Sequence, residues 1–276
     1  MQERRKPIVG IIGGKGKMGK WFSKFFRKTG RIVIISDLGT KFSNRYIAQK
    51  ADITIISVPI KETKKVIREI RSFVRREALL ADFTSLKEIP LHEMKKGKSG
   101  VLGMHPLFNQ LAKNLKGQTV VFCRGRENKW IPYLERLFKK NKARVSYMNA
   151  KTHDYHSAYM QVLTHFTNIA FAHALSWGKY FPKMSFMTPV SKLHSIVLGR
   201  IFSQNPELYA GIEIENPEFR RVLKGFLSSA HSLAKSVEKK DYKKFERAFS
   251  KTRGPYKNFI PLAKNKISNL IDIIET

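Results

Sequence analysis

A glycine-rich turn near the N-terminus constrains the fold of this chain more than any other feature. The segment "VGIIGGKGKMGKWF" (9–22) passes from an apolar run, typical of a buried strand, through three spaced glycines into a helical pattern. Gly14 permits the tight turn, Gly16 lets the backbone approach a pyrophosphate, and Gly19 lets the helix pack on the sheet. Helix N-terminal amides would face the phosphates. The segment predicts a dinucleotide-binding turn formed by Gly14, Lys15, Gly16, Lys17, Met18 and Gly19.

Two further segments fit the same cofactor. Asp37 ends the second apolar run, where a carboxylate can accept hydrogen bonds from the adenosine ribose hydroxyls. A carboxylate there would repel a 2′-phosphate, which favours NAD over NADP, although Lys41 and Arg45 lie close enough to weaken the preference. Alternatively, Asp37 only begins the turn in "DLGT". The third apolar run ends in a rigid turn expected beside the cofactor, formed by Ser57, Val58 and Pro59.

The first 150 residues alternate strand-like and helical patterns. Seven short runs rich in β-branched and aromatic residues lie at 9–12, 32–36, 53–58, 79–83, 100–103, 119–123 and 144–148. Strand–helix–strand alternation with continuous apolar strands predicts a mainly parallel sheet covered on both faces. The last strands could run antiparallel. We therefore expect an α/β, Rossmann-type dinucleotide-binding domain over residues 1–150.

Strand signals stop at about residue 151, and helical patterns follow. Residues 152–206 contain only five charged side chains: Asp154, Lys179, Lys183, Lys192 and Arg200. A helical stretch that is apolar on every side must be buried, within its domain or against another subunit. The second domain, residues 151–276, is therefore expected to be all-α and to mediate homodimerisation.

Composition narrows the class of protein. The single cysteine, Cys123, excludes an internal disulfide framework and a cysteine-based zinc site, and no metal is expected. No apolar segment is long enough for a membrane span, so we expect a soluble, cytoplasmic protein. The formal net charge is +32. Because the lysines lie mostly on the polar faces of amphipathic patterns, we do not expect nucleic acid as a partner and assign the charge to solvated helix faces.

Polar side chains follow two later strands, at the sheet edge where ligands of a doubly wound fold bind. "LLADFTSLKE" supplies Thr84, Ser85 and Lys87, and "GVLGMHPLF" supplies His105 followed by a rigidifying proline. A histidine beside a nicotinamide can accept the proton of a substrate hydroxyl as hydride leaves the same carbon. The alternative is a structural histidine with satisfied hydrogen bonds.

The helical half offers an anion-binding side chain. Arg200, in "VLGRIFSQNPELY", lies in an apolar setting with few acidic residues nearby in sequence. A mostly buried arginine needs an anionic partner, which a substrate carboxylate or a distant Asp or Glu could provide. His165 lies on a largely apolar helix, where a core histidine is the commoner interpretation.

The words "IGGKGKMGKWF", "IISVPI", "DFTSLKE", "LGMHPLF", "HDYHSAYMQVLTHF" and "LGRIFSQNPELYA" occur in this order over roughly residues 8–250. In this pattern the chain resembles the prephenate dehydrogenase family, above all the dehydrogenase part of its bifunctional chorismate mutase–prephenate dehydrogenases. No mutase segment precedes the first strand, so a monofunctional chain is expected.

The resemblance implies oxidative decarboxylation of prephenate by NAD to 4-hydroxyphenylpyruvate, in tyrosine biosynthesis. It makes His105 the catalytic histidine that hydrogen-bonds the C4 hydroxyl, and it places Ser85 and Lys87 beside that histidine and the substrate. Arg200 matches the arginine that binds a prephenate carboxylate, and His165 matches an active-site histidine.

Two departures bear on the substrate. Asn109-Gln110 replaces the usual Gly-Pro after "HPLF", and Lys192 stands where bifunctional relatives carry a second arginine. A lysine keeps the charge but loses the planar fork, which leaves arogenate as an alternative substrate. Two other classes of protein also fit parts of the sequence. One is a dehydrogenase of the β-hydroxyacid or imine-reductase type, and the other is a non-catalytic NAD-sensing or nucleic-acid-binding protein.

Overall fold

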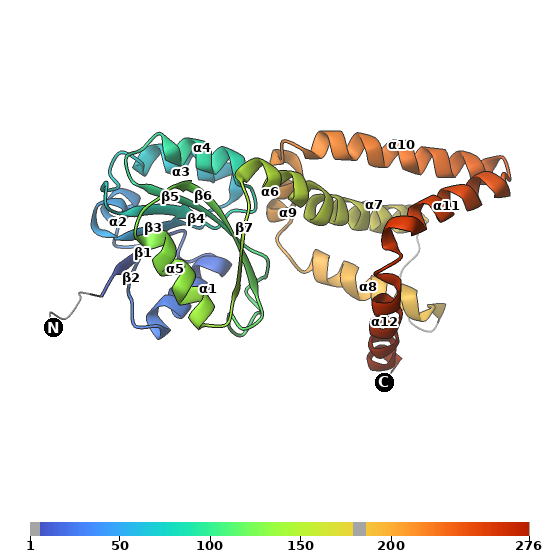
Figure 1. Cartoon of the computed structure of the whole chain (residues 1–276), viewed down its shortest axis with the longest axis horizontal. Coiled ribbons are helices and arrows are strands. Elements are labelled where there is room, and N and C mark those ends of the chain that lie inside the picture. The colour runs from blue at the N-terminus through green and yellow to red at the C-terminus, as the bar shows by residue number, and fades with distance from the viewer. Residues whose placement is uncertain (1–5, 179–185, 276) are drawn as a thin grey trace. The chain divides into compact units, whose positions relative to one another are not determined.

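The computed structural model describes residues 6–178 and 186–275, and the chain divides into two compact units (Figure 1). Unit 1 consists of Met1–Ala158 and Ala210–Pro217, and unit 2 of Tyr159–Tyr209 and Glu218–Thr276. The sequence did not predict that Ala210–Pro217 would belong to unit 1. Within unit 1 this segment is tied down by the buried Asn216 amide, which donates to the backbone oxygen of Asp154 at 3.2 Å.

Unit 1 is built on a seven-stranded sheet in the order β2-β1-β3-β4-β5-β6-β7. Strands β1 to β5 are parallel, β6 is antiparallel to β5, and β7 is parallel to β6. The mainly parallel sheet was expected, and the reversal at β6 decides the direction of the last strands, which the sequence left open. The strands are β1 (Ile8–Ile12), β2 (Ile32–Ser36), β3 (Ile53–Ile56), β4 (Leu79–Asp82), β5 (Gly100–Pro106), β6 (Thr119–Arg126) and β7 (Arg144–Tyr147).

Helices cover both faces of this sheet, because the strands are apolar on both sides. One core layer joins the sheet to α1 (Lys17–Lys28) and α5 (Trp130–Lys140) through fully buried Phe22, Phe26 and Phe138. The other joins it to α2 (Asn44–Lys50), α3 (Ile60–Ile70) and α4 (Glu88–Lys95). Figure 1 shows the two layers on opposite sides of the strands. Helix α6 (Ala150–Ser157) follows β7 near the end of the first segment of unit 1.

The strand order positions a ligand site. The chain winds outward from β1 to β2 in one direction and from β1 to β3 in the other, so the winding direction switches between β1 and β3. In open α/β sheets, ligands bind beyond the carboxyl ends of the strands at such a switch point. The glycine turn follows β1, and Ser57 follows β3, so both border this point.

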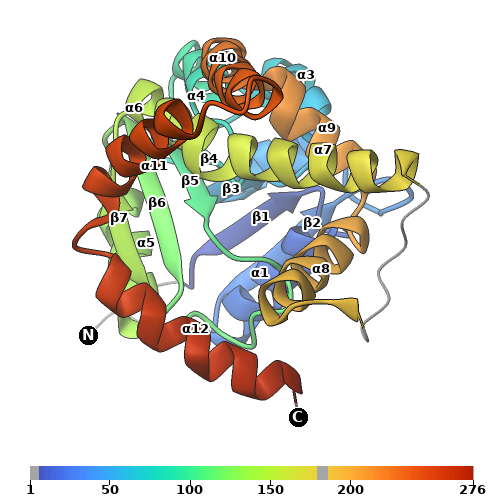
Figure 2. The same ribbon diagram turned by 90° about the vertical axis from the view of Figure 1, so that its right-hand side faces the viewer.

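Unit 2 contains helices only in its described residues (Figures 1 and 2). The π-helical turn Ala158–Val162, a rare conformation that is often found at functional sites, starts at the last residue of the first segment of unit 1 and continues into unit 2. The helices that follow are α7 (Leu163–Trp177), α8 (Pro189–Phe202), α9 (Pro206–Glu215, which ends in unit 1), α10 (Phe219–Glu238), α11 (Tyr242–Tyr256) and α12 (Ile260–Glu275).

The apolar helices of unit 2 are largely exposed in the single chain. Phe171 on α7 is 44% exposed, Trp177 77%, and Phe202 on α8 59%. Burial inside the unit, one of the two alternatives that the sequence left open, therefore does not occur for these side chains. Among the helices that lie within 6–178 and 186–275, none is long and apolar enough to cross a membrane.

Candidate active site

The glycine turn is held by close backbone contacts. Gly13 has φ +83°, and a Cβ there would lie 2.4 Å from the Ser57 oxygen, so only glycine fits. The left-handed residue is thus Gly13 and not Gly14, to which the sequence assigned the turn. Gly14 is required for another reason, since its Cβ would lie 2.6 Å from Cβ of Ile35 on β2. A Cβ on Gly19 would meet the Gly13 oxygen at 2.2 Å, as expected for close packing of helix on turn.

The turn has the shape that a dinucleotide pyrophosphate needs. A Cβ on the exposed Gly16 would have two neighbours within 4 Å, the Gly13 oxygen at 3.2 Å and the Ser57 oxygen at 3.8 Å, so a side chain there would fill space that the backbone leaves open. Gly16 is also the N-cap of α1, without a side-chain cap and with no acidic residue in the first turn. The amides of Lys17 and Met18 at this helix start can therefore donate to an anion. The residues present fit the cofactor.

Asp37 lies beside this turn. Its Oδ2 accepts a hydrogen bond from the Lys15 amide at 2.7 Å, and its Oδ1 accepts one from the Leu38 amide at 2.8 Å. The Asp37 backbone also forms the turn with Thr40, so the alternative role in "DLGT" is present in the structure, and the ribose-binding role stays a prediction. On the far side, Val58 is half-buried and Pro59 is the N-cap of α3.

His105 lies near the carboxyl end of β5 and is 5% exposed. Burial, followed by the nearby His153 and Lys87, holds the pKa of its imidazole well below the ordinary 6.5. A buried imidazole with this property stays neutral at physiological pH. A neutral imidazole can accept a hydrogen bond, and the role of His105 as the base stays a prediction.

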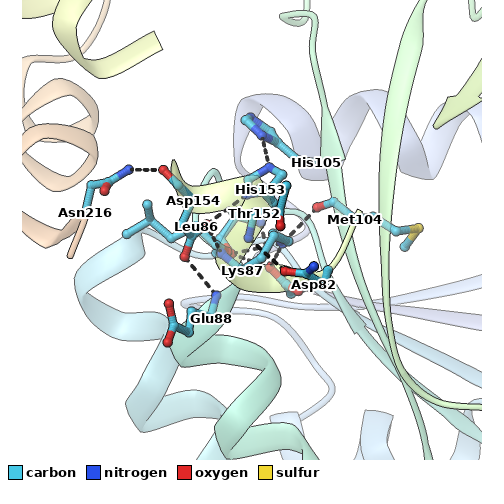
Figure 3. Close-up of polar contacts among 12 residues, drawn as sticks. Asp82, Leu86, Lys87, Glu88, Met104, His105, Thr152, His153, Asp154 and Asn216 are labelled. Carbon is cyan, nitrogen blue, oxygen red and sulfur yellow. Dashed lines mark hydrogen bonds and ion pairs between the residues drawn. The ribbon is translucent and has the colours of Figure 1, made fainter. Parts of the chain in front are cut away.

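A hydrogen-bonded chain runs inward from His105 (Figure 3). His105 Nδ1 lies 2.9 Å from Nε2 of His153, whose Nδ1 lies 2.8 Å from Oδ1 of Asp154. The Asp154 carboxylate also accepts the amides of Lys87 at 2.8 Å and Glu88 at 2.9 Å. His153 and Asp154, both on α6, are 3% and 1% exposed. All of these residues belong to unit 1.

Lys87 lies beneath this chain and is completely buried. Its ammonium pairs with Asp82 at the end of β4 and donates to the Met104 oxygen at 2.9 Å. Gly103 makes room for it, because a Cβ there would lie 2.8 Å from Cδ of Lys87. The sequence-based role of Lys87 as a substrate ligand does not agree with this enclosed position, which fits support of the strand that carries His105. Ser85, in the same segment, is half-buried.

The other predicted substrate residues lie in unit 2. His165 on α7 packs edge-on against Tyr209, with ring centroids 4.7 Å apart. Burial, and then the charge of Arg200, lowers the pKa of His165 to about 4, so the structure brings these two residues close together. Arg200 itself is exposed, and the expectation of a mostly buried arginine was wrong. The Arg200 side chain on helix α8 is thus open to solvent in the single chain. Lys192, two turns earlier on α8, is half-buried.

Sequence reasoning missed His153 and Asp154. Both lie within "HDYHSAYMQVLTHF", which was noted only for its resemblance. One signal was available, since Asp154 is the only acidic residue among the five charged side chains of residues 152–206. An isolated carboxylate in an apolar helical segment requires buried donors, and here they are two backbone amides and a histidine.

Comparison with known proteins decides the family. Residues 27–147 match the family model described as "Prephenate dehydrogenase, nucleotide-binding domain", and residues 149–251 match "Prephenate dehydrogenase, dimerization domain". The chain belongs to the prephenate dehydrogenase family. The first match begins after the glycine turn, so the assignment of that turn rests on the geometry given above.

Individual relatives agree with this family. A probable arogenate/prephenate dehydrogenase of Methanocaldococcus jannaschii is 33% identical over 259 residues, which are 86% of this chain and 58% of that protein. The T-protein of Haemophilus influenzae is 32% identical over 248 residues, which are 88% of this chain and 65% of that protein. This chain thus spans about three-fifths of the length of these relatives.

A solved structure agrees in fold. Prephenate dehydrogenase from A. aeolicus, in complex with hydroxyphenyl propionate and NAD+, superposes with a TM-score of 0.72 at 18% identity. The match covers 94% of this chain and 100% of that one. The expected order of a Rossmann-type domain followed by a helical domain is confirmed.

Proposed function

We propose that this protein catalyses the NAD-dependent oxidative decarboxylation of prephenate to 4-hydroxyphenylpyruvate. The observation that carries the proposal is His105. It is a buried imidazole at the carboxyl end of β5, with a pKa held well below 6.5 and with one ring nitrogen engaged by His153. Family membership supplies the reaction class, and His105 is the residue in unit 1 best suited to the proton transfer that the reaction needs.

The chain's own residues divide the work. NAD, when bound, accepts the hydride that leaves C4 of the substrate. The amides of the glycine turn donate hydrogen bonds to the pyrophosphate, and the Asp37 carboxylate accepts hydrogen bonds from the ribose hydroxyls. His105 accepts a hydrogen bond, and then the proton, from the C4 hydroxyl as that group becomes a carbonyl. Loss of the C1 carboxylate as CO₂ then makes the ring aromatic.

Asp37 supports NAD over NADP. Its carboxylate already accepts the Lys15 and Leu38 amides, which hold it beside the turn as a fixed negative charge. A 2′-phosphate would meet that charge directly. Asp37→Ser is therefore expected to weaken NAD binding and to improve NADP binding, as measured by the Kd of each cofactor.

The proposal assigns substrate carboxylate binding to Arg200, with His165 and Lys192 as further contacts. Arg200 offers a bidentate fork for a carboxylate. His165, with its pKa near 4, is neutral at pH 7 and can serve as a polar contact without adding charge. Ser85, half-buried beside the buried Lys87, is proposed to contact the reacting end of the substrate.

The direct test is NADH formation at 340 nm with NAD and either prephenate or arogenate. His105→Asn is expected to lower kcat/KM by ~10²–10⁴-fold, the usual contribution of a positioned acid or base. His92→Asn is the matched control, since His92 is an exposed histidine of the same unit. Absence of turnover with both substrates, with NAD still bound, would refute the proposal and favour a non-catalytic NAD-binding protein.

Arogenate is the second candidate substrate. It carries an amino group where prephenate has a keto group in the side chain, and Lys192 replaces an arginine of related enzymes. The M. jannaschii relative is named for both substrates. Turnover of arogenate alone would retain the chemistry and change only the substrate. Lys192→Arg would then be expected to shift the kcat/KM ratio toward prephenate.

We infer that two copies associate through unit 2. Its match is described as a dimerization domain, and large apolar side chains of α7 and α8 are exposed in the single chain. Exposed apolar surface of this kind marks interfaces. Sedimentation velocity is expected to give a dimer, and Trp177→Asp, which charges a 77% exposed ring, is expected to weaken it. A wild-type monomer at micromolar concentration would refute the inference.

A further inference from the structure

Hydrogen bonding fixes the state of the chain that ends at His105. The Asp154 carboxylate accepts backbone N–H groups on both oxygens, from Lys87 on Oδ1 and from Glu88 on Oδ2. Backbone amides can only donate, and these two lie at the N-terminus of α4, where partial positive charge favours an anion. The Asp154 carboxylate is therefore an acceptor also for its third neighbour, His153 Nδ1, which lies 2.8 Å away.

The position of each ring proton follows from the Asp154 carboxylate being an acceptor. His153 Nδ1 must carry hydrogen to donate to Asp154, and a histidine ring with its single hydrogen on Nδ1 has a lone-pair acceptor at Nε2. His105 Nδ1 lies 2.9 Å from that acceptor and must carry the hydrogen of the contact. The remaining nitrogen of His105, Nε2, is then unprotonated and available as a base.

We propose that His153 and Asp154 are positioning residues that keep the proton of His105 on Nδ1 and thereby keep Nε2 free to accept the substrate's proton. The inference rests on the proposed function for its catalytic meaning. A neutral histidine without such a partner would place its proton on either nitrogen, and the tautomer protonated on Nε2 cannot act as the base. Neither residue is expected to touch the substrate.

The expected loss of kcat on removal of His153 can be judged by analogy with catalytic triads. In a Ser-His-Asp triad, converting the carboxylate to an amide gives the wrong tautomer and lowers kcat by ~10⁴-fold. Here the carboxylate acts through a second imidazole, and the acceptor that His105 contacts is neutral. Removal of His153 is therefore expected to lower kcat by ~10²-fold, at the lower end of the range for acid–base groups.

Three variants separate positioning from structure. His153→Phe removes the acceptor while filling the buried space. His153→Gln can return an amide oxygen near the place of Nε2, so it is expected to recover most of the lost activity. His156→Phe is the control, because His156 is exposed on the same helix. The expected result is a fall in kcat for His153→Phe alone, with the Kd for NAD unchanged.

A second readout does not depend on turnover. In protein labelled with ¹⁵N-histidine, the two ring nitrogens of His105, assigned with His105→Asn, report which one carries the proton. Wild type is expected to show a protonated Nδ1 and an unprotonated Nε2, and His153→Phe to show a mixture or the reverse.

Each outcome has a definite meaning. A wild-type His105 protonated on Nε2 would overturn the inference even if the enzyme turns over prephenate. Activity of His153→Phe within twofold of wild type would also overturn it. Conversely, the expected tautomer in a protein without turnover would support the hydrogen-bonded chain and refute only the proposed reaction.

Discussion

The buried ion pair between Lys87 and Asp82 allows a quantitative test of how the site is supported. Both side chains are 0% exposed, and the Lys87 ammonium also donates to Met104, the residue before His105. Removing one partner leaves an uncompensated buried charge, which typically costs 3–5 kcal/mol, whereas replacing both partners by apolar residues is often near neutral. Lys87→Met is therefore expected to destabilise unit 1 by about 4 kcal/mol, and the double variant Asp82→Leu, Lys87→Met by much less.

The assay is urea unfolding followed by tryptophan fluorescence. In a Trp177→Phe background the remaining tryptophans, at positions 21 and 130, both lie in unit 1 and report its transition. Lys139→Met is the control, since it breaks a pair with Glu135 in which the lysine is 58% exposed, and exposed ion pairs contribute little to stability. If Lys87→Met costs no more than this control, the reasoning is wrong.

Three further predictions concern titration and the glycine turn. The acid limb of kcat/KM is expected below pH 6.5, because burial lowers the pKa of His105; a limb at or above 6.5 would contradict this. Hydrogen bonding by Arg68 lowers the pKa of Glu93 to about 2 from 4.5, so its contribution to stability should be complete above pH 4.5 and lost as the pH falls toward 2. Glu93→Gln should remove that part of the acid dependence in unfolding measurements. Gly13→Ala should raise the Kd for NAD more than tenfold, judged by cofactor titration, because its Cβ would clash with backbone. Gly30→Ala, with a similar φ of +80° but nothing within 4 Å, should leave that Kd unchanged.

The sequence predicted those features that depend on local pattern. Apolar runs and turn residues located all seven strands and the glycine turn, since strand burial and helix starts leave clear periodicities. It assigned the left-handed turn to Gly14 in place of Gly13, because the spacing of glycines does not show which one opposes the Ser57 oxygen. That contact joins residues 44 positions apart, and sequence alone gives no register between them.

Features that depend on tertiary contacts were harder to predict. Lys87 reads as a polar residue at the sheet edge, yet its stem passes beside Gly103 into the core. The apolar neighbours of Arg200 suggest a buried side chain, but helix α8 buries only one side: Leu198 and Ile201 are buried, whereas Phe202 and Arg200 are exposed. The sequence marks Asp154 as an isolated carboxylate, but its donors are amides 66 and 67 positions earlier, which no local pattern identifies.

The location of His153 and Asp154 on α6, immediately before the border at Ala158, has an evolutionary consequence. Every group of the hydrogen-bonded chain that ends at His105 is encoded within unit 1, whereas the proposed carboxylate ligands are encoded on α7 and α8. If the proposed function holds, mutations in those two helices can alter which cyclohexadiene acid is accepted without disturbing the base. A lineage could drift between prephenate and arogenate while retaining one proton-transfer apparatus, and grafting these helices from a relative would be a practical way to exchange the two specificities.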